Sequence, residues 1–469
     1  MTFEELKQLI YNGQDKFKDI NFANDIWLNR FSLTGPGIPL DLVFENCFFK
    51  SIHIELTEND IVATVLFRNC HISSNVFILG VRKKRLTFSD CLFKSEVLEI
   101  KDCGPDFSFS LISTAIPIVR IHGCQDSEEL IFRACNVKGL EINNSSFNKI
   151  SIFDSNTSIE YLHISRISLK VLEIIYGFFG WLKVEDSEIE NLELFGISRS
   201  KNDIGNSLRL KNIKGDNLKI SEVSFNGLVQ INLISFSNSK FLQNSVFAGN
   251  LEFKNQDLSG FMIYALDLFE AKLEFENSII YDAHFFDIVW PKNFLLSYDY
   301  KSLDSYGKLD FKLRSLAAQY RQLKIMSSKN GDKISSLSFF AHEMEVNYIL
   351  LKREKKDKLW DWLLLSTNKH FSGFGLSYIK PLIWLFGVHI VLFILFVLAG
   401  YNDMSFVWPW TNTFDGIGVS VGQYFYLLNP LRSLPDSTNG WVLVIDFFSR
   451  LINSYFIYYF LKATRKFSL

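Results

Sequence analysis

The sequence predicts a mainly β protein, in which a right-handed parallel β-helix is followed by an α-helical hairpin and a two-span transmembrane helical domain. Three observations lead to this prediction. A pattern of apolar and small residues recurs through the first 300 residues or so, a helical period replaces it from Leu309, and two long apolar segments lie near the C-terminus.

The composition excludes some classes of protein. The chain has 469 residues, of which 48% are hydrophobic and 21% charged, with a net charge of −2. A disordered chain would be less hydrophobic, and a general nucleic-acid binder would be basic, so we expect no nucleic-acid partner. Residues 1–40 carry a net charge of about −1, 41–300 about −9 and 301–469 about +8, which indicates two chemically different halves.

The cysteines indicate a reducing compartment. All six lie in the first third of the chain and none forms a CxxC pair, so we expect no zinc site and no other metal or cofactor. The N-terminal residues 1–7 are polar and acidic, without the apolar core of a cleavable secretion signal. We therefore expect reduced thiols and no disulfides.

The repeat consists of two apolar residues five positions apart, with a small residue two positions before the second. Phe44, Cys47 and Phe49 show it first. Further copies begin at Phe67, Phe88, Phe132, Ile142, Val184, Ile220, Phe236, Phe253 and Phe275. We interpret 41–300 as stacked coils whose apolar residues point inward, with cysteines and serines in one buried ladder. Residues 1–40 would hold a cap, with a short amphipathic helix over 3–16.

These residues resemble the pentapeptide-repeat family, whose five-residue unit has a central Leu or Phe and a small residue two positions earlier. The resemblance covers roughly residues 40–290 and implies a right-handed β-helix. This chain has few tandem runs of fives, so we expect an irregular version with longer excursions between faces. A leucine-rich-repeat horseshoe is the competing fold, but its fixed LxxLxL register is absent.

Residues 301–375 read as a helical connector. One helix is expected from Leu309 to about Ile325, and a second from Asp332, a candidate N-cap, to about Lys356. A basic run over 352–358 then precedes the apolar and aromatic stretch 359–365. This combination favours a helix on a membrane surface, and an ordinary core helix with a solvated face is the alternative.

Residues 376–469 form the predicted transmembrane module. Span 381–400 has no charged residue, and span 441–461 contains Asp446 and Arg450 at a spacing that allows an intrahelical ion pair. Charges in lipid are costly, so this polar face, which also carries Asn453, should meet protein or water. His389, inside the first span, is either a neutral residue bonded within the bundle or a pore-facing group.

Lysine and arginine set the expected orientation. They are frequent before the first span and follow the second, whereas the connection 401–440 carries only Arg432. We therefore expect a multi-pass membrane protein with both termini cytoplasmic. The resemblance to a pentapeptide-repeat protein fused to membrane spans implies the bacterial inner membrane. The Trp-Pro-Trp segment 408–410 is expected at the interface.

The connection also contains segment 414–428, which is too short to span and too apolar for water, so it is re-entrant or interfacial. The layout resembles two-transmembrane ion-channel modules of the potassium-channel type, which implies a homo-oligomeric pore. The potassium filter TVGYG is absent, so potassium selectivity is not predicted. Gly418, Gly422 and Gln423 are the residues expected near the constriction. Behind it we expect Asp446, Arg450 and Asn453.

We find no complete catalytic motif and expect no enzyme. His342-Glu343 begins an HExxH pattern without its second histidine, and the phosphate-binding and nucleophile motifs are absent. The acidic candidates on the β-helix are Asp154, Glu185, Asp186 and Glu188.

Two main functional hypotheses follow. In the first, a cytoplasmic β-helix serves as a sensor or docking domain that controls an oligomeric, ion-channel-like pore. In the second, a membrane-anchored scaffold binds a protein partner through its β-helix and does not conduct. A third, mimicry of duplex nucleic acid by an acidic rod, is weakened by the basic run 82–85.

Overall fold

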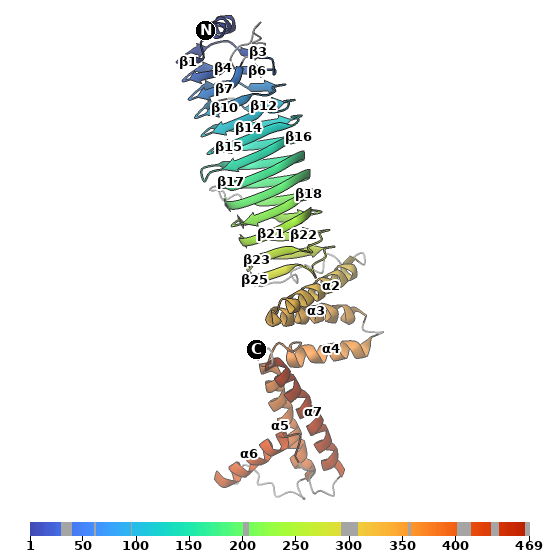
Figure 1. The fold of residues 1–469 in the computed structure, drawn as a ribbon. Coiled ribbons are helices and arrows are strands. Elements are labelled where there is room, and N and C mark those ends of the chain that lie inside the picture. Colours follow the sequence, from blue (N-terminus) through green and yellow to red (C-terminus); the bar gives the residue numbers. More distant parts are fainter. Residues whose placement is uncertain are drawn as a thin grey trace. The chain divides into compact units, whose positions relative to one another are not determined.

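A computed structural model shows a parallel β-solenoid of about 11 turns followed by helices (Figure 1). The chain divides into two compact units, Met1–Tyr298 and Asp299–Leu469, which are described separately. The structure describes residues 1–29, 40–60, 62–94, 96–199, 206–291, 308–354, 358–400, 414–432 and 440–464.

The first unit contains one N-terminal helix, α1 (Phe3–Tyr11), and then only strands within the described residues. The longest of these strands bend around corners and cover more than one face of a coil. In chain order the strands are β1 (Lys16–Lys18), β2 (Asn21–Phe22), β3 (Ile26–Asn29), β4 (Leu40–Glu45), β5 (Phe48–Phe49), β6 (Ile52–Glu55), β7 (Val62–Arg68), β8 (His71–Ile72), β9 (Val76–Leu79), β10 (Arg85–Ser89), β11 (Leu92–Phe93), β12 (Val97–Lys101), β13 (Ser108–Ile112), β14 (Ala115–His122), β15 (Ser127–Arg133), β16 (Asn136–Phe153), β17 (Ser158–Arg199), β18 (Ser207–Ser221), β19 (Ser224–Phe225), β20 (Val229–Asn232), β21 (Ser235–Phe247), β22 (Asn250–Lys254), β23 (Phe261–Asp267), β24 (Lys272–Glu276) and β25 (His284–Val289).

Neighbouring coils pair in parallel and place like residues above one another. Phe44 of β4 pairs with Phe17 of β1 on one side and with Phe67 of β7 on the other, and Phe67 pairs with Phe88 of β10. The rings of these four residues stack at 5.2, 5.1 and 4.6 Å between centroids. All four side chains are buried, as the five-residue pattern predicts.

Each coil turns a corner at a residue in the left-handed region, two positions after an inward apolar residue. Asn46, Asn69 and Asp90 occupy this position after successive phenylalanines, with φ of 54°, 49° and 56°. Asparagine and aspartate tolerate this conformation better than other residues with a Cβ atom. This preference explains why a polar residue so often separates the two halves of the repeat.

The small residue after the corner points inward and bonds back across it. The thiol of Cys70 donates to the carbonyl oxygens of Arg68 and Phe44, at 3.3 and 3.4 Å. Hydroxyls act in the same way in other coils, where Ser145 donates to the carbonyl of Asn143 at 2.8 Å. A small side chain with one donor fits here because the corner leaves a buried carbonyl to satisfy.

The prediction of a single cysteine and serine ladder was wrong, because each central coil has more than one left-handed corner. Cys47, Cys70, Cys91, Thr114 and Cys135 form one ladder. Cys103, Cys124 and Ser145 stack on the other corner. All six cysteines are buried and unbridged, in agreement with the predicted absence of disulfides.

The N-terminal helix α1 is shorter than predicted. Thr2 and Glu5 form a capping box at its start, and Leu6 and Ile10 are buried. The helix ends at Tyr11 rather than near residue 16, because Gly13 adopts a φ of 87° that ends the helical turn.

The second unit is helical within the described residues. Its helices are α2 (Lys308–Lys329), α3 (Lys333–Arg353), α4 (Leu359–Ser372), α5 (Ile379–Gly400), α6 (Phe414–Leu428) and α7 (Gly440–Thr464). Helices α2 and α3 form the predicted hairpin around Gly331, whose φ is 79°. The carboxylate of Asp332 accepts the N–H of Ser335 at 3.0 Å, which confirms this residue as the N-cap.

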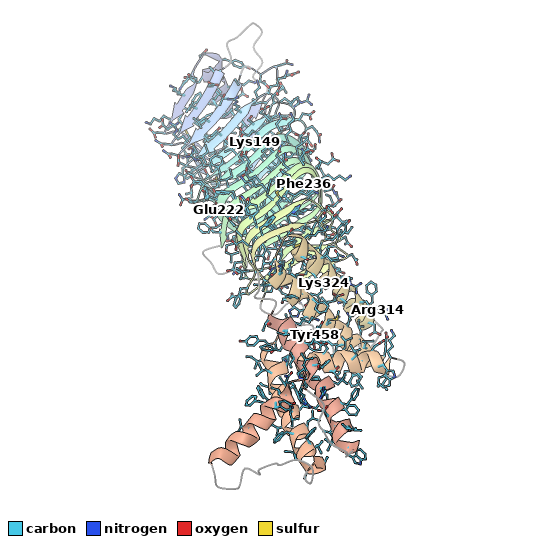
Figure 2. The ribbon with its side chains drawn as sticks, turned by 60° about the horizontal axis from the view of Figure 1, so that its bottom comes forward. Lys149, Glu222, Phe236, Arg314, Lys324 and Tyr458 are labelled. Carbon is cyan, nitrogen blue, oxygen red and sulfur yellow. The ribbon has the colours of Figure 1, made fainter. Side chains whose placement is uncertain are left out.

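A buried ion pair holds the hairpin together. The carboxylate of Glu343 on α3 is 3% exposed and receives hydrogen bonds from Arg321 and Lys324 of α2, both at 2.8 Å. Lys324 is labelled in Figure 2. His342 stacks on Tyr320 at 5.3 Å between ring centroids, and burial lowers the pKa of this imidazole. Helix α3 ends at Arg353, three residues earlier than predicted.

Two helices of the second unit are long and apolar enough to cross a membrane. They are Ile379–Phe396 of α5, with a mean hydropathy of 2.2, and Gly440–Thr464 of α7, with 1.2. They overlap the predicted spans, whereas the Trp-Pro-Trp segment lies outside the described residues.

Truncation of one ring in the phenylalanine stack should destabilise the solenoid. We expect Phe67→Ala to reduce the free energy of unfolding by about 3–5 kcal/mol, because the neighbouring coils cannot close the cavity. Phe48→Ala is the control, since Phe48 is 42% exposed and should cost less than about 1 kcal/mol. Urea unfolding of the full-length protein in detergent measures both values, and equal losses would contradict the inward stack.

The buried thiols should resist modification, and Cys135 should weaken the fold at high pH. Burial raises the pKa of Cys135 from 9.0 to about 11, so the folded state retains a proton that the unfolded chain releases. Stability from this group is complete below pH 9 and is lost as the pH rises through 11. We expect no reaction with a colorimetric disulfide reagent at pH 8 before denaturant is added. Rapid labelling of the folded protein would contradict the prediction.

Candidate functional site

A buried polar cluster lies where α5, α6 and α7 meet. Asp446 of α7 is fully buried and pairs with two guanidinium groups. Nη2 of Arg432, which follows α6, donates to its Oδ1, and Nε of Arg450 donates to its Oδ2 at 2.7 Å. The predicted intrahelical pair is confirmed, and the cluster has one more positive than negative charge.

The cluster supplies hydrogen-bond donors to the carbonyl groups at the C-terminal end of α6. Asn453 donates from its amide nitrogen to the carbonyl oxygens of Leu427 and Leu428, each at 3.2 Å. Nη1 of Arg432 also donates to the carbonyl of Leu427 and, at 3.0 Å, to that of Asn429. Helix ends leave such carbonyls without intrahelical partners and carry a partial negative charge, which a guanidinium complements.

His389 of α5 completes the arrangement from the opposite helix. Its Nε2 lies 3.0 Å from the carbonyl oxygen of Tyr424, and its Nδ1 lies 3.5 Å from the amide nitrogen of Asn453. A carbonyl can only accept, so Nε2 carries a proton and donates it to Tyr424. The structure thus favours a histidine bonded within the helical bundle over a pore-facing one.

These contacts place the end of α6 near the middle of its neighbours. His389 lies ten residues after the start of α5 and eleven before its end, and Asn453 lies thirteen residues after the start of α7 and eleven before its end. At 1.5 Å per residue both residues are about 15 Å or more from the ends of their helices. The hydrophobic contacts of Leu427 with Phe396 and Val442 hold the same junction.

The three residues expected near a constriction lie on α6, outside the polar cluster. Gly418 and Gly422 are exposed on α6, where a Cβ atom at either position would meet nothing within 4 Å. Gln423 belongs to the same helix, and its side chain lies outside the described residues. The structure therefore joins Asp446, Arg450 and Asn453 to the end of α6, whereas Gly418 and Gly422 have open space around them among the described residues.

Sequence reasoning did not identify the role of Arg432. It counted this residue as the single cation of an external connection, but its side chain is 1% exposed and faces Asp446. The sequence did contain a signal. Arg432 is the single lysine or arginine of the connection 401–440, and the cost of an isolated charge in lipid favours pairing it with Asp446 of the second span. Sequence spacing could not supply this pairing, because Pro430 and a turn separate Arg432 from α6.

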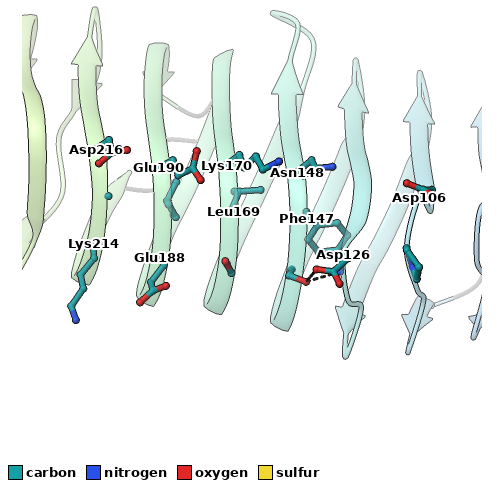
Figure 3. A pocket seen from close by; sticks show the side chains of 15 residues that line it. Asp106, Asp126, Phe147, Asn148, Leu169, Lys170, Glu188, Glu190, Lys214 and Asp216 are labelled. Carbon is teal, nitrogen blue, oxygen red and sulfur yellow. Dashed lines mark hydrogen bonds between the residues drawn. The ribbon is translucent and has the colours of Figure 1, made fainter.

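The solenoid carries a second candidate, a groove of about 580 Å³ across several coils (Figure 3). Phe147, Leu169 and Ile189 form its apolar base, and charged side chains from successive coils line it. These charged residues are Asp106, Asp126, Lys170, Glu188, Glu190, Lys214 and Asp216. Within the described residues no group of three potential metal ligands is found.

Three of the four acidic candidates are engaged with basic or amide groups. Lys183 and His163 bond to Glu185, and although partial burial opposes them, they hold its pKa below the usual range. Asp154 lies 3.7 Å from Arg133. The side-chain amide of Asn212 donates to the carboxylate of Asp186 at 2.9 Å. The fourth acidic candidate, Glu188, lines the groove.

No protein-family model, curated protein or solved structure matches this chain.

The charge balance of the cluster predicts a ranking of substitutions. Asp446→Ala should destabilise the protein most, by about 3–5 kcal/mol, because it leaves the guanidinium of Arg432 buried without a counter-ion. Arg432→Ala should lower the stability less, because the remaining Asp446–Arg450 pair is neutral. This variant loses mainly the hydrogen bonds to the end of α6. Arg450→Ala should cost least, because its side chain is 23% exposed.

Thermal unfolding of the three full-length variants in detergent tests this order. Arg432→Lys is the matched control, because it keeps the charge but loses the fork that reaches both Asp446 and the α6 carbonyls. It should fall between the original protein and Arg432→Ala. Equal midpoints for Asp446→Ala and Arg450→Ala would contradict the assigned charge balance.

Proposed function

We propose that this chain is a protein of the bacterial inner membrane whose cytoplasmic β-solenoid senses a signal or docks a partner and thereby controls an oligomeric, ion-channel-like pore. In this proposal the solenoid is of the right-handed, pentapeptide-repeat type, and α5, α6 and α7 are the pore-forming module. No catalytic step or cofactor is assigned.

The end of α6 is the observation that carries the proposal. Backbone groups without partners are tolerated at membrane depth only where protein or water satisfies them. Arg432, Asn453 and His389 bond to the last carbonyls of α6 near the middle of α5 and α7. This favours a re-entrant half-helix over a helix lying on the membrane surface.

The exposure of α5 and α7 supports their place in lipid. Only 22% and 28% of their most apolar windows are buried, whereas the core helix of a soluble protein would be mostly covered. The proposed orientation, with both termini cytoplasmic, also gains support from Arg432. Because this residue is buried against Asp446, the connection between the spans presents no lysine or arginine to solvent.

A pore requires several copies, since two spans and one half-helix cannot enclose a channel. The outer part of α6 is suited to this task. Gly418 and Gly422 lie one helical turn apart with open space around them, and Val421 and Phe425 are 49% and 55% exposed. Small residues allow close helix approach within membranes. We propose that neighbouring copies cover this part of α6.

The alternative function is a membrane-anchored scaffold that does not conduct. One observation favours it: the solenoid has a groove with both signs of charge, which suits a protein partner. In that case the polar cluster would serve only to hold α6, and nothing would pass between the copies.

Ion flux through liposomes that contain the full-length protein separates the two functions. We expect flux that Gly422→Leu abolishes, because leucine would fill the space between copies, while its Cβ atom would meet nothing within 4 Å among the described residues. Gly387→Leu is the matched control, since this α5 glycine also has open space around it, and its flux should stay within about twofold of the original.

A closed pore would resemble a scaffold in this assay, so deletion of the solenoid provides the second arm. Deletion should release the gate and permit flux if the solenoid controls a pore. A correctly inserted protein that is silent both with and without its solenoid would contradict conduction and favour the scaffold.

A further inference from the structure

Helix α4 has one face fixed against the hairpin. The ring of Trp362 lies 6.4 Å from that of Tyr348 on α3, and the ammonium group of Lys369 bonds to Glu345 at 2.5 Å. These contacts lie on the same side of α4, because residues seven apart in a helix differ by only about 20° in direction.

The opposite face of α4 is apolar and exposed. Trp360, Leu363 and Leu364 are 79%, 43% and 65% exposed, at positions that share one side of a helix. Phe371 lies within about 20° of Trp360 in direction. Its ring packs against Trp384 of α5 at 4.9 Å and Phe456 of α7 at 5.3 Å.

Helix α4 therefore lies across the end of the α5–α7 pair at which α5 begins and α7 ends (Figure 1). Its exposed apolar face points to the side from which these two helices extend, and its other face meets α3. This is the geometry of an amphipathic helix at the surface of a bilayer, with its apolar side toward the acyl chains.

Two lysines gather at the turn between α4 and α5. Gly373, Phe374 and Gly375 are consecutive left-handed residues, with φ of 56°, 58° and 86°. A Cβ atom on Gly373 would lie 3.6 Å from Nζ of Lys380, and one on Gly375 would lie 3.8 Å from Cε of Lys462. Both lysines are exposed, and neither makes an ion pair with a residue in the described ranges.

No acidic side chain is near enough to neutralise this pair among the residues that the structure describes on α4. Asp361 precedes Gly373 by twelve residues, or about 18 Å along the helix. The carboxylate of Glu345 is already bonded to Lys369. Exposed aromatic side chains typical of the membrane interface are present near the turn, and Tyr378 and Tyr458 are 43% and 59% exposed. Tyr458 is labelled in Figure 2.

We propose that this junction binds an anionic phospholipid. Lys380 and Lys462 hold the phosphate of the headgroup, and the acyl chains lie along Trp360, Leu363 and Leu364. The inference rests on the membrane insertion proposed above and does not depend on conduction. Its consequence is a lipid bound where the helical connector meets the spans, the point through which a signal from the solenoid would pass.

Lipid titration of the delipidated full-length protein in an uncharged detergent tests the site. Native mass spectrometry would count bound short-chain phosphatidylglycerol and phosphatidylcholine. We expect phosphatidylglycerol to bind about tenfold more tightly, from the charge of two lysines near the headgroup. The double variant Lys380→Gln/Lys462→Gln should lose this preference and keep the weaker binding of phosphatidylcholine.

The control is Lys333→Gln/Lys352→Gln, which removes the same charge from exposed positions on α3. It should retain the preference, and unchanged melting temperatures would show that both variants are folded. Equal binding of the two lipids, or an equal loss in both variants, would overturn the proposal. Full competition by soluble glycerol phosphate would also overturn it, because the site would then recognise a free anion.

Resistance of the protein to alkaline extraction from membranes keeps the two proposals distinct. Extraction of the original protein would contradict insertion itself. Retention in the membrane without lipid preference would overturn only the headgroup site.

Discussion

The carbonyl groups at the end of α6 set the constraint on which the helical unit depends. They lie among apolar side chains, where an unsatisfied carbonyl costs about 1–3 kcal/mol, so each requires a donor. Asn453 and Arg432 supply the donors, and Asp446 balances the charge of Arg432. A buried ion pair adds little net stability by itself, so its value here is in fixing one position of α6 against α5 and α7.

The solenoid depends on a similar requirement, since each coil must supply hydrogen-bond donors to the carbonyl groups at its corners. The left-handed residue at a corner leaves a carbonyl facing inward, and the small residue that follows donates to it, as Cys70 does to Arg68. Parallel pairing then aligns the apolar residues of successive coils, so that Phe44, Phe67 and Phe88 stack. The sequence repeat therefore reflects two requirements, the hydrogen bonds at the corners and the stacking of apolar residues between coils.

Local patterns were therefore predictable and distant pairings were not. The spacing of Phe44, Cys47 and Phe49 predicted stacked coils, and the position of Asp332 predicted its role as a cap. The two ladders could not be separated in the sequence, because both corners use the same small residues. Helix α1 was predicted too long because the stop signal Asn12-Gly13 was overlooked, and Gly13 adopts the left-handed conformation that ends the helix.

The candidate site shows the same division. Asp446 and Arg450 are one helical turn apart, so their spacing in the sequence predicted the ion pair. The contacts of Asp446 with Arg432 and of Asn453 with Leu427 join different elements, and spacing could not predict them. Gly418, Gly422 and Gln423 were chosen by resemblance to a channel module, and the residues that the structure describes leave open space around the two glycines. Their role depends on contacts between copies.

The most direct test of the account is the membrane depth of α6, measured by spin labels on single introduced cysteines. The six native cysteines are buried, so we expect the spin label to react only with the introduced cysteine. A label at Phe425, which is 55% exposed, should be as deep as one at Ile390 in the middle of α5, and a label at Gly418 should be shallower. Equal, shallow depths at Phe425 and Gly418, with Ile390 deep, would show a surface helix and contradict the account.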